Sequence, residues 1–141
     1  MASARIFANE VTEETICFSA VVSGKPKFAA TDLGNQFHVT IISAEAVSEP
    51  DPHVKLHYII SLEYRFKNGF DYCHIEETGS AAFPDEARQS TCRLSVIDGK
   101  ATLSNIVISD GLLKCFLNID FLVRFCSERV LNVLLAEELV T

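Results

Sequence analysis

The histidines are the first side chains to test for chemistry, and the sequence contains four: His38, His53, His57 and His74. His53 and His57 have the i, i+4 spacing with which two imidazoles on one helix bind zinc. They begin a segment of strict apolar–polar alternation, however, and in a strand they would lie about 13 Å apart. His57 and His74 are expected on one face but well separated. We therefore predict no metal site and exposed or half-exposed structural histidines.

Nucleophilic catalysis requires a serine or cysteine beside a base that a third group orients. Cys73 precedes His74, but neighbouring strand residues point to opposite faces, so the two cannot act as nucleophile and base. The same geometry excludes Glu76 with Glu77 as an acid/base pair. The sequence contains no G-x-S-x-G motif, and its six glycines are scattered singly and form no phosphate-binding loop. The protein is therefore predicted to be non-enzymatic and to need no cofactor.

The cysteines predict a reducing compartment. Their number is odd and no C-x-x-C motif is present. All lie among apolar neighbours, where cysteine behaves as a small buried hydrophobe, so we expect reduced core thiols. The opening segment Met1–Glu10 has no apolar run typical of a signal peptide, which favours a cytoplasmic protein. The most apolar stretch, Leu112–Val123, is interrupted by polar residues, so no membrane insertion is expected. The cysteines are Cys17, Cys73, Cys92, Cys115 and Cys126.

Size and charge narrow the class of protein further. The chain has 141 residues, a mass of 15.6 kDa and 48% hydrophobic residues, which fits one domain over residues 1–141 with its own core. The net charge is -7, so binding to nucleic-acid phosphates is not expected. Tryptophan is absent and tyrosine scarce, whereas phenylalanine occurs ten times, which favours aromatic burial over ligand stacking.

A long β-hairpin is the clearest structural signal. The even positions from Val54 to Phe66 are all apolar, and most odd positions between them are polar, as in a strand with one buried face. Asn68-Gly69 then predicts a two-residue type I′ turn. With that loop Leu62 faces Ile75, Tyr64 faces Cys73 and Glu63 faces His74, so the apolar residues share a core face.

Two further strands are expected before this hairpin, over Thr15–Val22 and roughly Gln36–Val47, and residues 91–126 can be interpreted in two ways. Cys92–Leu103 fits a short hairpin around Asp98-Gly99, and Leu113–Phe125 alternates as a strand. Alternatively, a helix follows Gly99 and uses Leu103, Ile106 and Val107. Ser127–Glu138 fits a terminal helix in either case.

The preferred fold class is therefore α+β, with a four-stranded antiparallel sheet followed by a C-terminal helical region. The alternative is an all-β sandwich or barrel of about eight strands. In the first case the apolar C-terminal third covers the core face of the sheet. The opposite face still carries apolar side chains, which we predict to form an oligomer interface or a binding surface for other proteins. These residues are Val21, Ile42, Ile59, Phe70 and Tyr72.

The segment Ile6–Phe83 resembles the SecB-type protein-export chaperones in the order and spacing of its elements. Cys73-His74-Ile75-Glu76-Glu77-Thr78-Gly79 followed by Phe83 is similar to the family's pattern of Cys, aliphatic, two Gln/Glu and Gly leading to Phe. Cys92-x-Leu94 and Ala101-x-Leu103 resemble the stretch that opens the family's main helix. The resemblance implies an acidic cytosolic tetramer that holds unfolded polypeptides without a nucleotide.

The chain departs from this family at two places. Ser104-Asn105-Ile106 stands where the family has a Phe-Pro-Tyr-x-Arg-like helix start. Thr15, Ser19 and His74 replace the acidic residues that contact the translocase ATPase, so the resemblance does not extend to translocase docking. The first functional hypothesis is a SecB-like, non-enzymatic, client-binding chaperone. The alternative is a structural or assembly protein with an all-β oligomerising fold, such as a virion component, for which self-association replaces client binding.

Overall fold

The described chain consists almost entirely of long antiparallel strands. In this computed structural model the backbone is described for residues 2–135 and side chains for residues 10–127. One short 3-10 helix interrupts the strands. The elements are β1 (Ala2–Gly24), β2 (Asp32–Val47), β3 (His53–Phe66), β4 (Gly69–Ala82), η1 (Asp85–Gln89), β5 (Ser95–Ser109) and β6 (Leu112–Leu135).

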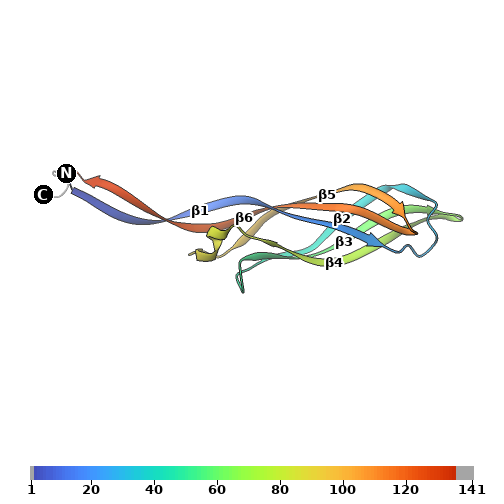
Figure 1. Ribbon diagram of the computed structural model, residues 1–141, viewed down its shortest axis with the longest axis horizontal. Helices are drawn as coiled ribbons and strands as arrows, with labels where there is room; N and C mark the ends of the chain where they lie inside the picture. The colour runs from blue at the N-terminus through green and yellow to red at the C-terminus, as the bar shows by residue number, and fades with distance from the viewer. Residues whose placement is uncertain (1, 136–141) are drawn as a thin grey trace.

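The strands form two three-stranded antiparallel sheets, in the orders β1-β6-β5 and β2-β3-β4. The sheets pack face to face as a sandwich, with β6 central in one and β3 central in the other. Figure 1 shows the sandwich at one end of an elongated molecule and a two-stranded ribbon of β1 and β6 reaching away from it. Both described chain ends lie at the far tip of this ribbon.

The core lies between the two central strands, because each buries every second residue. On β3 the exposed fraction is 0% at Val54 and Ile60, and on β6 it is 0% at Leu117 and Phe121. The polar residues between them point outward, as period-two alternation requires. The hydroxyl groups of the buried Tyr58 and Tyr64 reach the rim, where they donate to Glu77 and Asp71. The interior is therefore apolar, and its two tyrosines keep partners for their polar ends.

The preferred α+β fold is wrong. β1 does not join the sheet of the long hairpin but pairs with β6 in the other sheet, so four strands do not form one sheet. No helical region follows: the predicted terminal helix from Ser127 is the continuation of β6 as far as Leu135, and its last residues lie outside the described part of the chain. The sheet-plus-helix arrangement implied by the SecB-type resemblance is therefore not the fold of the described residues.

The all-β alternative has the right class but overestimates the number of strands. The stretch predicted as a hairpin around Asp98-Gly99 is one strand, β5, and six strands make up the described residues. A bulge between Ser104 and Val107, with Asn105 at a φ of 52°, breaks its alternation. That extra residue is why Leu103, Ile106 and Val107 had a helix-like spacing. The turn to β6 is made by Asp110 and Gly111, both at positive φ.

The long hairpin is confirmed, but its register is two residues from the prediction. Phe66 pairs with Gly69, so the loop is Lys67-Asn68, and Leu62 pairs with Cys73 rather than Ile75. Gly69 opens β4 at a φ of 152°, a conformation that side chains rarely adopt. A shift of two keeps every side chain on its predicted face. The core-face prediction is therefore correct although the partners are not.

The prediction of five reduced thiols is also wrong, because Cys92 and Cys126 form a disulfide. It ties the segment between η1 and β5 to β6. Ser90 reinforces this junction, since its hydroxyl donates to the Cys92 carbonyl at 2.9 Å and accepts from the Cys126 amide at 3.0 Å. The remaining described cysteines are free: Cys73 and Cys115 are buried, as predicted, and Cys17 is exposed.

Truncation of a central core residue should be costly. Leu117→Ala removes a side chain that is 0% exposed and leaves a cavity between the sheets, so we expect a loss of about 2–5 kcal/mol of unfolding free energy. Urea denaturation followed by circular dichroism measures it. Val21→Ala in the same sheet is the control, because Val21 is 78% exposed and should change stability by less than about 0.5 kcal/mol. Equal effects of the two substitutions would contradict the sandwich.

Loss of the disulfide should lower the free energy of unfolding, because the bond restricts the conformations of the unfolded chain. The cysteines are separated by 34 residues, and a loop of this length is expected to contribute about 3–4 kcal/mol. The double variant Cys92→Ser/Cys126→Ser should show that loss in urea. Reductant should lower the parent protein to the same stability and leave the variant unchanged. A parent protein insensitive to reductant would argue against the bond.

Candidate functional site

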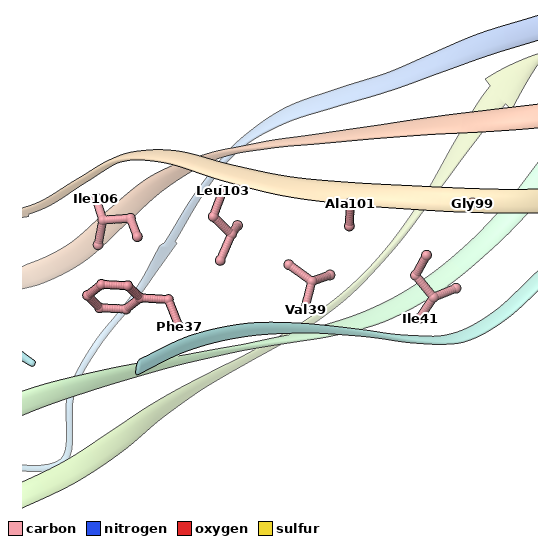
Figure 2. Close-up of a pocket in the computed structure, with 7 residues that line it drawn as sticks. All are labelled: Phe37, Val39, Ile41, Gly99, Ala101, Leu103 and Ile106. Atoms are coloured by element: carbon pink, nitrogen blue, oxygen red, sulfur yellow. The ribbon is translucent and has the colours of Figure 1, made fainter. Parts of the chain in front are cut away.

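An apolar groove between β2 and β5 is the best-defined hollow in the described structure. Its volume is about 480 Å³. Figure 2 shows side chains from both strands pointing toward one another across it. No lining residue has a charged or hydrogen-bonding side chain. The lining residues are Phe37, Val39, Ile41, Gly99, Ala101, Leu103 and Ile106.

The groove exists because β2 and β5 are edge strands of different sheets. Their inward-facing residues meet across the sandwich, but no backbone ladder joins the two strands. Gly99 and Ala101 are the two smallest residues that line the groove, and both lie on β5. At Gly99 an added Cβ would come within 3.0 Å of the Phe121 ring, and Ala101 contributes only a methyl group. The opening is therefore built by small residues on one wall facing Val39 and Ile41 on the other.

The opposite seam, between β1 and β4, is closed by contrast. There the Phe18 ring lies against Gly79, and a Cβ added at Gly79 would come within 2.5 Å of that ring. Phe18 also forms a tilted aromatic pair with Tyr58. Gly24 likewise lies against Ile75 and Cys73. Glycines thus let side chains pack closely at this seam, as Gly99 does for the Phe121 ring on the other side of the sandwich. The sandwich has one sealed side and one open side.

Bulges mark the strands that flank the groove. β2 has register shifts between Leu33 and Phe37 and between Ile41 and Ser43, and β5 has one on each side of its central residues. The pairings of β1 and β4 contain none. Bulges bend edge strands and limit uncontrolled edge-to-edge pairing. The straight segments between them, around Val39 and Ala101, are the parts that line the groove.

The outer face of the β2-β3-β4 sheet carries a polar network. His57 Nε2 lies 2.7 Å from Glu76 Oε1, and Ser61 Oγ lies 2.8 Å from His74 Nδ1. The Tyr72 hydroxyl donates to Gln36 and Glu63. All of these groups are exposed or half-buried, so each pair adds little stability. The predicted Glu63–His74 pairing is not formed, because the two-residue register shift places Glu63 opposite Tyr72.

Ser61 and His74 satisfy one condition for nucleophilic catalysis, a short hydroxyl–imidazole contact. Ser61 is half-buried and His74 exposed on the outer face of the sheet, and neither residue lines one of the described pockets. Cys73 is buried while His74 is exposed, which confirms that they point to opposite faces. In the described part of the chain, no group of three or more potential ligands lies close enough to hold a metal ion.

The structure separates the five residues predicted to form a binding surface. Val21 lies on the outer face of the sheet that contains β1, whereas Ile42, Ile59, Phe70 and Tyr72 belong to the other sheet. Ile59 is only half-exposed. Phe70 is 63% exposed but lies beneath the Arg65 guanidinium, 5.3 Å from its ring centroid. These residues therefore do not form one continuous patch, and their role in binding stays a prediction.

The sequence does not predict this groove. The spacing of Phe37, Val39 and Ile41 predicts one side of a strand. Ala101 and Leu103 fit a short hairpin, whereas the alternative helix uses Leu103 and Ile106. The sequence feature that could have indicated a groove is the pair of small residues Gly99 and Ala101, at positions where the other lining residues are large and apolar. It could not be interpreted without knowing that β2 faces β5, because those strands are far apart in the sequence.

No protein-family model, curated protein or solved structure matches the chain. Among the residues that the structure describes, no helix has the length and apolarity to cross a membrane.

The buried tyrosine and cysteine side chains make the stability of the fold depend on pH. Burial, assisted by the Glu77 carboxylate, raises the pKa of Tyr58 to about 12, and burial also raises the pKa values of Tyr64, Cys73 and Cys115. A raised folded-state pKa gives stability that is complete below the unfolded value and is lost as the pH rises through the folded one.

We expect Tyr58→Phe to reduce the loss of stability at high pH. In the parent protein the contribution of Tyr58 is lost between pH 10.0, its ordinary value, and about 12. The variant lacks this ionisable group, so its urea midpoint, relative to pH 7, should fall less over that interval. An identical fall in both proteins would contradict the burial of the hydroxyl beside Glu77.

Proposed function

We propose that the protein is a non-enzymatic structural or assembly protein whose all-β fold associates with other copies of itself. The observation that carries the proposal is the ribbon of β1 and β6 outside the sandwich. We define the arm as residues 2–10 of β1 with residues 127–135 of β6. Backbone pairing continues along it from Glu10↔Ser127 to Ala2↔Leu135.

Among the described residues, no third strand pairs with the arm. β5 pairs with β6 only as far as Ser95↔Arg124, and the hairpin sheet does not extend along the ribbon (Figure 1). A two-stranded ribbon alone is at best marginally stable in water, and stability normally requires a third strand or a packed face. Another molecule that covers the arm supplies both. Assembly is therefore the role that such an extension serves best.

A client-binding chaperone is the second candidate function, and the groove favours it. The apolar groove between the edge strands β2 and β5 suits an extended apolar segment of a client, which it would hold by many weak contacts. The SecB-type resemblance supports this role only through its sequence pattern, since its sheet-plus-helix fold is not found. Its tetrameric state and its clients stay predictions.

The cytoplasmic location also stays a proposal, and the Cys92–Cys126 disulfide counts against it. Disulfides persist mainly in oxidising compartments, and cytosolic ones are rare. Assembly does not depend on either location. A chaperone for export clients, by contrast, would have to work in the cytoplasm, which is a reducing compartment.

The proposed function predicts a native particle heavier than the 15.6 kDa chain. Native mass spectrometry and sedimentation velocity over a range of protein concentrations should both show a defined oligomer. We expect an oligomer because a two-stranded arm is marginally stable alone and gains packing when another copy covers it. A monomer throughout that range would overturn the assembly proposal.

The chaperone candidate predicts that the protein suppresses aggregation of a chemically unfolded client, measured by light scattering. Val39→Asp places a carboxylate in the groove and should weaken suppression at least about tenfold, because desolvating a charge opposes apolar binding. Thr40→Asp, the exposed neighbour on β2, is the matched control and should behave as the parent protein. No suppression by the parent protein would remove this candidate.

A further inference from the structure

We propose that the groove between β2 and β5 receives the arm of a second copy of this chain. The inference rests on the proposed assembly function and deepens it by naming the two surfaces that meet. It follows from three observations: the chemistry of the groove, the length and composition of the arm, and the direction in which the arm leaves the sandwich.

The groove selects an extended apolar occupant. Its walls offer methyl, methylene and aromatic groups and no side-chain hydrogen-bonding partner. Along β2 it runs from Phe37 to Ile41, about 13 Å, and along β5 from Gly99 to Ile106, about 23 Å, at the strand rise per residue. A polar or charged segment would lose its hydration there without compensation. The backbones of β2 and β5 also have unpaired edges that can hydrogen bond with an incoming strand.

The arm is as long as the groove, and the last six described residues of its β6 strand are mostly apolar. It has nine backbone pairs, from Ala2↔Leu135 to Glu10↔Ser127, and so extends about 27 Å from the first pair to the last. The sequence of Val130–Leu135 contains five aliphatic residues among six. This run extends about 17 Å from its first residue to its last, so it is long enough to follow the groove along β2.

The arm cannot reach the groove of its own chain. It leaves the sandwich beyond Arg124, the last residue of β6 that pairs with the beginning of β5. In Figure 1 it runs outward from there, away from the strands that line the groove. A straight ribbon that points away from the sandwich can cover only another molecule's groove. The partner is therefore a second copy.

Arm and groove are different surfaces, so two arrangements are compatible with the contact. If each copy places its arm in the other's groove, an isologous dimer forms; otherwise the contact is heterologous and continues to a third copy. In each arrangement an arm residue of one chain lies beside Ala101 of another. That juxtaposition is directly measurable and does not depend on the number of copies.

Cross-linking between two full-length variants tests the contact. One carries Ala101→Cys in the groove and a mass tag; the other carries a single arm cysteine at Ser3, Ala4, Ala8 or Asn9. The arm positions form two adjacent pairs, because neighbouring strand residues face opposite sides and one of each pair must face the groove. Cys17→Ser in both chains removes the exposed thiol. After mixing, a short bismaleimide should join tagged and untagged chains.

The matched control places the cysteine at Thr102 instead of Ala101. Thr102 is the next residue of β5 and is exposed on the outer face. We expect at least tenfold more cross-linked product with Ala101→Cys than with Thr102→Cys for at least one arm position. An oligomer that shows no such preference would overturn the arm-in-groove contact while leaving assembly intact. A monomeric parent protein would overturn both.

A second measurement avoids cross-linking chemistry. Val39→Asp should raise the dissociation constant of the oligomer at least tenfold in sedimentation, whereas Thr40→Asp should leave it unchanged. Circular dichroism and urea midpoints confirm that both variants are folded. If a folded Val39→Asp variant assembles as the parent protein does, the groove is not the receiving surface.

Discussion

The packing of β3 against β6 is the interaction on which the rest of this protein depends. Each strand is central in its sheet and presents an unbroken row of apolar side chains, including Ile60 on one and Leu117 on the other, both fully buried. Burial of these rows drives the association of the two sheets, since apolar surface removed from water is the main favourable contribution to folding. The flanking strands are held to the central ones by backbone ladders and complete the layers.

The two sides of the sandwich differ in how their facing side chains meet. Between β1 and β4, Gly79 admits the Phe18 ring and the sheets close. Between β2 and β5, Gly99 and Ala101 face Val39, and an apolar groove is left open. Bulges on the strands that flank the opening keep their edges irregular, so that uncontrolled strand pairing is limited while the apolar floor stays accessible.

The ribbon of β1 and β6 connects this architecture to assembly. Within the sandwich, β6 lies between two strands; beyond Arg124 its one strand partner among the described residues is β1. The disulfide between Cys92 and Cys126 is located at this transition and ties β6 to the segment that precedes β5. The junction is thus covalently reinforced where β6 loses its pairing with β5.

The sequence by itself determined the strands with strict alternation, the faces that they bury and the long hairpin, because period-two patterning is a local property of the chain. It did not determine the hairpin register, the continuity of β5 across its bulge or the partner of β1, and the preferred helical C-terminal region was wrong. Only the tertiary structure decided that β1 pairs with β6, that Cys92 meets Cys126 and that β2 faces β5. Those relations join residues distant in the sequence, and the free energy that selects them comes from packing of whole sheets, which no local pattern encodes.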